Sequence, residues 1–232
     1  LVPDSGPTVA SRATVSAGNA ICDAAAQMQE RLRPLASELL EADLDDVTVA
    51  AGGFAGPGEG FVPFADVANL LYQRRENPGA LGWYRSPLRE YDADSGQGGA
   101  YMFYSFGAHV TRVRVDTWTG KVDVTKVHAV HDVGRAIHPP SLEGQIQGGV
   151  VQAMGWATME DLVLQEGRLL NASFTDYLLP TAADAPKIAM TFLEDAEPLG
   201  PYGARGVGEP SFIPGGAAIA NAVSNAIGVP VT

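Results

Sequence analysis

The sequence predicts an α+β fold in which mixed and antiparallel strands pack against long helices. Residues 14–40 carry apolar side chains at steps of three and four, which is the spacing of an amphipathic helix. Residues 99–118 and 121–133 alternate apolar with polar side chains, as half-buried strands do. Helical and strand-like segments follow one another irregularly and not as repeated β-α units, which favours α+β over α/β.

The first 90 residues are expected to hold two helices and one short strand. Pro34 lies inside the first helix and is expected to kink or divide it. Residues 47–50 predict a strand, the glycine-rich stretch 52–60 a loop, and residues 64–76 a short helix. The loop carries neither GxGxxG nor the Lys-Ser/Thr pair of a phosphate-binding loop, so it gives little support to nucleotide binding.

The two central strands are expected to form a hairpin with a turn at 116–120. In the first strand, Val113 and Val115 alternate with charged residues, so one face of the strand is expected to meet solvent. In the second strand the apolar set moves from even to odd positions. That change of phase predicts a β-bulge near Thr125 and Lys126.

Residues 141–232 predict a helix at 141–156, short strands at 158–164 and 187–193, and a small apolar helix at 211–227. Gly148 and Gly149 lower the propensity of the first of these helices. Either tight packing against another backbone or contact with a cofactor would explain them.

Composition narrows the class of protein. The chain has 232 residues, enough for one large domain or two small ones, which would divide as 1–90 and 91–232. Its net charge of −12 disfavours binding to nucleic acid. A single cysteine, Cys22, allows no internal disulfide and no zinc or iron–sulfur cluster. We expect a cytoplasmic protein that does not span a membrane. Because both ends of the sequence look cut, we also expect a split subunit or a partial chain.

Three segments are candidates for function, and each has a structural alternative. Glu209 stands in the glycine-rich loop 200–210, where an acidic residue could simply favour the dipole of the following helix. Gln145 flanks the apolar stripe of the helix at 141–156. Ser11 precedes the first helix, either as its cap or beside a bound anion or oxo group.

The histidines form no metal-binding pattern. His128 and His131 are three apart on a strand and should therefore face opposite sides. We interpret these two, with His109 and His138, as structural or pocket-lining residues.

Taken in order, four segments resemble the second half of the molybdopterin-binding subunit of the xanthine dehydrogenase and aldehyde oxidase family. They are residues 2–11, residues 107–116 with 132–139, residues 143–155 and residues 205–210. The resemblance covers almost the whole chain, and the ordered set is specific where each piece alone would be weak.

The resemblance implies roles for individual residues. Glu209 would be the catalytic base that takes a proton from the attacking oxygen, which then adds to an electron-poor carbon. Gln145 would hydrogen-bond an oxo ligand or the pterin, and Ala10 would bring its backbone near the metal. The remaining implied contacts with the cofactor, or with charge developing on the substrate, are Thr8, Val9, Ser11, Arg12, Arg205, Gly206, Val207 and Gly208. Molybdenum itself would be held by the pterin dithiolene and by no protein ligand.

The resemblance also implies a larger complex, since the full subunit of this family is much longer than this chain. We expect a second molybdopterin-binding subunit, an iron–sulfur subunit with 2Fe-2S clusters and a flavin subunit with FAD. The expected cofactor is molybdopterin with molybdenum in the cytosine dinucleotide form, although no residue decides against the monophosphate. The expected reaction is hydroxylation of a purine or another aromatic N-heterocycle with water as the oxygen source. An aldehyde oxidase component, a non-catalytic scaffold subunit and a stand-alone binding domain are the alternatives.

Overall fold

A computed structural model describes residues 7–87 and 90–231 of the chain. Contacts divide it into two compact units, one of Leu1–Val15 with Leu88–Thr232 and one of Ser16–Pro87. The helix α1 (Ala13–Leu40) contributes residues to both. The two-subdomain division at residue 90 stays a prediction. No helix in the described part of the chain is long and apolar enough to cross a membrane.

The smaller unit, Ser16–Pro87, combines most of α1 with a three-stranded antiparallel sheet and a short helix. The strands are β1 (Thr48–Ala50), β2 (Gly53–Ala55) and β3 (Phe61–Pro63), paired in that order, and the helix is α2 (Phe64–Gln73). Leu32, Leu35, Val47, Val67 and Leu71 belong to its buried core. Part of the predicted loop 52–60 is therefore strand β2, and α1 continues as one helix through Pro34.

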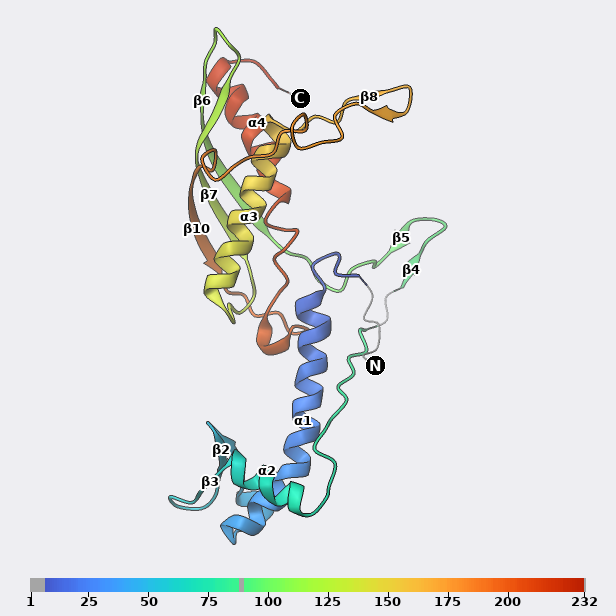
Figure 1. Ribbon diagram of the computed structural model, residues 1–232, viewed down its shortest axis with the longest axis vertical. Helices are drawn as coiled ribbons and strands as arrows, with labels where there is room; N and C mark the ends of the chain where they lie inside the picture. Colours follow the sequence, from blue (N-terminus) through green and yellow to red (C-terminus); the bar gives the residue numbers. More distant parts are fainter. Residues whose placement is uncertain (1–6, 88–89, 232) are drawn as a thin grey trace. The chain divides into compact units, whose positions relative to one another are not determined.

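The larger unit is built on a mixed three-stranded sheet in the order β10-β7-β6. The long hairpin of β6 (Gly107–Val115) and β7 (Val122–Asp132) is antiparallel, and β10 (Lys187–Leu193) lies parallel to β7. The helix α4 (Ile213–Ile227) packs on β6, and α3 (Pro139–Thr158) packs beside α4 (Figure 1). This two-layer arrangement confirms the predicted α+β class.

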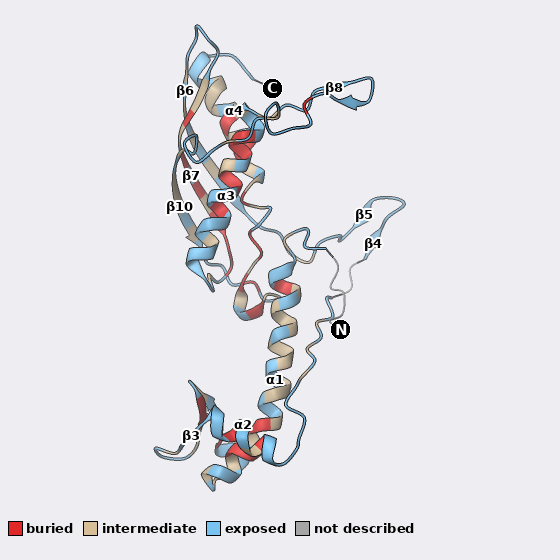
Figure 2. Cartoon of the chain, viewed as in Figure 1, coloured by how far each residue is buried: buried red, intermediate tan, exposed pale blue. Residues whose placement is uncertain are grey.

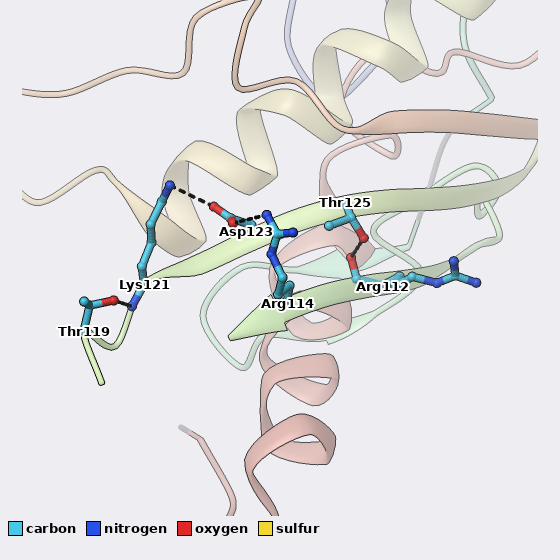
Figure 3. A network of polar contacts seen from close by, with 6 residues as sticks. All are labelled: Arg112, Arg114, Thr119, Lys121, Asp123 and Thr125. Carbon is cyan, nitrogen blue, oxygen red and sulfur yellow. Dashed lines mark hydrogen bonds and ion pairs between the residues drawn. The ribbon is translucent and has the colours of Figure 1, made fainter. Parts of the chain in front are cut away.

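The predicted bulge in the hairpin is confirmed at Thr125. Arg112 pairs with Lys126 and Val113 with Val124, so Thr125 has no partner residue on β6. Its hydroxyl donates to the carbonyl oxygen of Arg112 at 3.1 Å (Figure 3). The bulge explains the change of phase in the sequence, because one extra residue moves the following side chains to the other face.

The core of this unit lies between the sheet and the two helices. It is made by apolar residues of β7, α3 and α4, with Val207 from the loop before α4 (Figure 2). The predicted stripe of α3 is buried at Ile146, Gly149, Val150 and Ala153. This core fixes the positions of both the helix that carries Gln145 and the loop that carries Glu209.

Two predicted strands differ in the structure. Residues 99–106 leave the sheet, so β6 begins only at Gly107. Residues 159–163 have no regular structure because α3 continues to Thr158 and the next strand, β8 (Leu164–Gln165), is a two-residue piece paired with β9 (Arg168–Leu169). A second small hairpin joins β4 (Tyr91–Asp92) to β5 (Gln97–Gly98).

Candidate functional site

The carboxylate of Glu209 is held by two consecutive residues that precede α1. The backbone N–H of Ala10 donates to Oε1 at 2.9 Å, and the hydroxyl of Ser11 donates to Oε2 at 3.3 Å. The same hydroxyl accepts the backbone N–H of Glu209 at 3.0 Å. Ser11 therefore fixes both ends of Glu209, and its predicted role as a helix cap is replaced by this contact.

The segment that holds Glu209 has an unusual backbone. Ala10 and Ser11 have φ angles of 54° and 51°, in the left-handed region that non-glycine residues rarely adopt. Each such residue costs on the order of 1–3 kcal/mol, so neighbouring structure must impose the conformation. Gly206 packs directly against this segment, since a Cβ at this position would overlap the carbonyl oxygen of Ser11. Only glycine allows the two backbones to approach this closely.

The helix α3 packs against the loop that carries Glu209. The buried hydroxyl of Ser211 donates to the carbonyl oxygen of Gly208 at 2.7 Å, and a Cβ at Gly149 would overlap Ser211. Tight packing therefore explains Gly149. A Cβ at Gly148 would meet nothing within 4 Å. The helix α4 begins four residues after Glu209, so the carboxylate is oriented by Ala10 and Ser11 and not by the helix start.

A first cavity, of about 340 Å³, lies beside the loop and carries Gln145. Thr8, Ser11, Gly206 and Gly208 line it with Gln145. Residues at the beginnings of α1 and α3 and residues of the segments 133–138 and 204–207 also contribute to the lining. The space at Gly208, where other residues have a Cβ, lies 3.7 Å from both the Gln145 Oε1 and the Ser11 Oγ. Three of the segments singled out in the sequence thus meet at one cavity.

A second cavity, of about 530 Å³, carries Glu209. Its lining includes Ala10, Ser11 and Arg12, together with the residues 100–105 that left the sheet. Ser11 and Gly206 line both cavities, so their close contact marks the boundary between the two.

The remaining predicted site residues lie in different surroundings. Val9 is exposed, and Arg12 donates to the carbonyl oxygen of Pro7 at 3.0 Å. Val207 is a buried core residue that also lines the first cavity. Residues 2–6 of the predicted pterin-contacting loop lie outside the described part of the chain.

The side chain of Arg205 is only 8% exposed and is bonded to protein oxygens. One of its nitrogens lies 3.4 Å from an oxygen of Asp132 and 3.6 Å from one of Glu197, and another donates to the carbonyl oxygen of Tyr104. Its backbone N–H donates to Val133. The contact of Arg205 with a cofactor stays a prediction, while these intramolecular contacts show that it organises the loop.

The sequence missed a pair of histidines beneath α4. His109 on β6 and His131 on β7 share a hydrogen bond between their Nε2 atoms at 2.9 Å. Burial, and then the charge of His131, lowers the pKa of His109 to about 4, and burial also lowers the pKa of His131. His128 faces the other side and bonds Thr191, as the spacing predicts. Only strand register, which single-sequence patterns leave open, could have revealed the pair.

The first cavity fits a large polar cofactor. It offers the Gln145 carboxamide, the Ser11 hydroxyl and the starts of two helices, where free N–H groups favour negatively charged oxygens. The open space at Gly208, between Gln145 and Ser11, lets a flat ligand approach the backbone. Arg135 and Arg205 also line the cavity, so its polar and cationic groups together suit a pterin and its phosphate.

The fold and the site together define a cofactor-binding domain with a carboxylate at its edge. Residues 1–186 match the molybdopterin cofactor-binding domain, and the chain belongs to that family. This is the molybdenum hydroxylase family of xanthine dehydrogenases and related proteins, so the family predicted from the four segments is confirmed.

Individual proteins similar to this chain support the same family. The chain is 36% identical to the gamma subunit of the 6-hydroxypseudooxynicotine dehydrogenase complex of Paenarthrobacter nicotinovorans, over 98% of this chain and 28% of that protein. It superposes on a crystal structure of Cu,Mo-CO dehydrogenase with a TM-score of 0.82 at 29% identity, covering 98% of this chain and 28% of that one. For quinoline 2-oxidoreductase from Pseudomonas putida 86 the TM-score is 0.77 at 32% identity, covering 94% and 28%. The chain thus spans little more than a quarter of their lengths.

Proposed function

We propose that this chain is the part of a molybdenum hydroxylase that binds molybdopterin and supplies the catalytic base, Glu209, for hydroxylation of an aromatic N-heterocycle. The observation that carries the proposal is the carboxylate of Glu209, which lines the second cavity and is held by Ala10 and Ser11, beside the first cavity that carries Gln145. When bound, the cofactor supplies the redox chemistry of the reaction.

The carboxylate is suited to accept a proton. An ionised carboxylate has about four acceptor positions, and Glu209 uses one on each oxygen for the N–H of Ala10 and the hydroxyl of Ser11. Acceptor positions therefore remain for a proton of the attacking oxygen. Because both oxygens are already fixed, the side chain loses little freedom when it acts as a general base.

The other predicted residues bind and orient the cofactor. Gln145 would hydrogen-bond it through the carboxamide, while Ser11 and the backbones of Gly206 and Gly208 shape the cavity wall. The N–H groups of the glycine loop are able to stabilise negative charge that develops on the reacting groups. We propose the cytosine dinucleotide form of molybdopterin, as expected from the resemblance.

The substrate class is supported by two of the relatives. Quinoline is an aromatic N-heterocycle, and 6-hydroxypseudooxynicotine contains one. A purine, the more specific expectation, is one member of this class. We further propose that the chain works in the cytoplasm with a second molybdopterin-binding part, an iron–sulfur subunit and a flavin subunit, since relatives are named as subunits of complexes.

The test is Glu209→Gln in the native complex that contains this chain. We expect turnover of quinoline to fall by a factor on the order of 10² to 10⁴, the usual contribution of a general base, while the molybdenum content per complex stays unchanged. The matched control is Glu30→Gln, an exposed carboxylate on α1, which should leave both quantities unchanged. Undiminished turnover in Glu209→Gln, or a native complex without molybdenum, would contradict the proposal.

A further inference from the structure

The residues 100–105 form part of the wall of the cavity that carries Glu209. We call Tyr101, Phe103 and Tyr104 the aromatic segment. All three line the cavity, and the rings of Tyr101 and Tyr104 pack edge to face with their centroids 6.0 Å apart. The two tyrosines are 66% and 65% exposed, so their rings are not part of the protein core.

This segment has no regular secondary structure, and a buried arginine anchors it. Arg205 donates to the carbonyl oxygen of Tyr104, and its guanidinium is held in place by Asp132 and Glu197. The side chain of Arg205 is 8% exposed, and those of the two carboxylates are 7% exposed. The planar, multiply donating guanidinium can bond several oxygens in fixed directions, which an ammonium group cannot do.

The same arginine is directly joined to the loop of Glu209. Its chain neighbour Gly206 lies against the backbone of Ser11, and Ser11 holds the carboxylate of Glu209. A continuous set of contacts therefore connects the wall of the cavity, through Arg205, with the predicted catalytic base.

The buried arginine differs from the arginines on the hairpin. Arg114 also pairs with an aspartate, Asp123, at 2.8 Å, but its side chain is 76% exposed (Figure 3). An exposed pair of this kind contributes little to stability and constrains no cavity. Arg114 therefore provides a matched control for Arg205.

We propose that Arg205 is a positioning residue that holds the aromatic segment at a fixed position relative to Glu209. Tyr101 and Tyr104 thereby select planar aromatic substrates over aliphatic ones. The inference rests on the proposed function and deepens it by naming the residues that recognise the ring. A cavity of about 530 Å³ accommodates a bicyclic aromatic molecule. Edge-to-face or offset contacts with tyrosine rings favour flat aromatic ligands, and a displaced wall loses those contacts.

The experiment compares quinoline with acetaldehyde in the native complex, as the ratio of their kcat/KM values per molybdenum. The variants are Arg205→Gln, Tyr101→Ala and Tyr104→Ala, with Tyr101→Phe and Tyr104→Phe as conservative replacements. Arg114→Gln and Tyr72→Ala, an exposed tyrosine on α2, are the matched controls. Binding of quinoline is measured in parallel by calorimetry, which needs no turnover.

We expect the ratio to fall about tenfold in the first three variants, mainly through a higher KM for quinoline. The phenylalanine variants and both controls should stay within about twofold of the unchanged complex. A uniform loss of active protein would not move the ratio, because both substrates would fall together. If Arg205→Gln yields no folded complex, Arg205→Lys decides, since it keeps the buried charge but loses the planar fork.

Several outcomes would overturn the inference. They are an unchanged ratio in the alanine and Arg205 variants, a parallel loss for both substrates, or an unchanged complex that oxidises acetaldehyde but neither binds nor oxidises quinoline. These results differ from a failure of the proposed function, which would appear as activity that survives Glu209→Gln. If activity depends on Glu209 but the ratio is unchanged in the variants of Arg205, Tyr101 and Tyr104, this inference is rejected and the proposed function stands.

Discussion

Ser11 and Glu209 are 198 residues apart in the chain, and one hydroxyl group joins them twice. The Ser11 hydroxyl donates to the carboxylate of Glu209 and accepts the backbone N–H of the same residue. The backbone N–H of Ala10 holds the other carboxylate oxygen. The segment before α1 is thereby bonded to the loop before α4, far away in the sequence. These bonds give the carboxylate a defined direction.

Ser11→Ala should lower turnover without removing the cofactor. The variant loses both hydrogen bonds of the hydroxyl, while the bond from Ala10 remains. A hydrogen bond to a charged group contributes about 1.5 kcal/mol or more, so we expect kcat to fall roughly tenfold at unchanged molybdenum content. Ser224→Ala is the control for steady-state kinetics, since it removes a hydroxyl that donates to Ala220 and accepts the N–H of Val231, away from the site. An unchanged kcat in Ser11→Ala would show that the hydroxyl does not orient the base.

The adjacent glycines of α3 should respond in opposite directions to alanine. Gly149→Ala places a Cβ against Ser211, so we expect a loss of about 1–3 kcal/mol in the free energy of unfolding. Gly148→Ala enters open space and should stabilise the helix by about 0.5–1 kcal/mol. Urea denaturation of the two variants measures both values. Equal effects would contradict the packing that we describe between α3 and the loop of Glu209.

Asp132 and Asp123, both in the larger unit, should differ strongly in their contributions to stability. Asp132 is buried against Arg205 and also accepts the backbone N–H of Gly134. Asp132→Asn leaves the arginine with one charged partner, and we expect a loss of about 3 kcal/mol. Asp123→Asn, on the exposed hairpin, should leave Tm unchanged. Thermal unfolding at low and high salt compares them, and a similar decrease in both would refute the distinction.

The buried histidine pair should make the protein less stable in mild acid. The folded pKa of His109 is lowered from 6.5 to about 4, and the pKa of His131 is also lowered. Between these values the unfolded chain binds protons that the folded chain does not. Stability should therefore be fully present above pH 6.5 and decline as the pH falls toward 4, with uptake of about one proton per imidazole on unfolding.

His109→Gln tests the origin of this pH dependence. Denaturation midpoints of the variant between pH 7 and pH 4 should fall less steeply than those of the unchanged protein. His128→Gln, on the exposed face of β7, is the control and should leave the slope unchanged. Identical slopes in all three proteins would assign the pH dependence to other groups.

Local patterns predicted most of the elements and the loops of the site. The spacing of apolar residues located α1, α3, α4 and the hairpin, and the change of phase located the bulge at Thr125. These patterns succeeded because the periodicity of apolar residues indicates which side of a helix or strand is buried. The ordered segments around Ala10, Gln145 and Glu209 were sufficient to predict the family.

The tertiary structure alone decided which of these residues meet. Apolar periodicity does not say what an element packs against. Residues 99–106 were therefore predicted as strand, although they lie outside the sheet and residues 100–105 line the cavity of Glu209. The sequence predicted that Arg205, in a glycine-rich loop, contacts the cofactor or the substrate. In the structure its side chain is buried between Asp132 and Glu197. Contacts between distant segments arise from packing of the whole unit, whose partners no local spacing encodes.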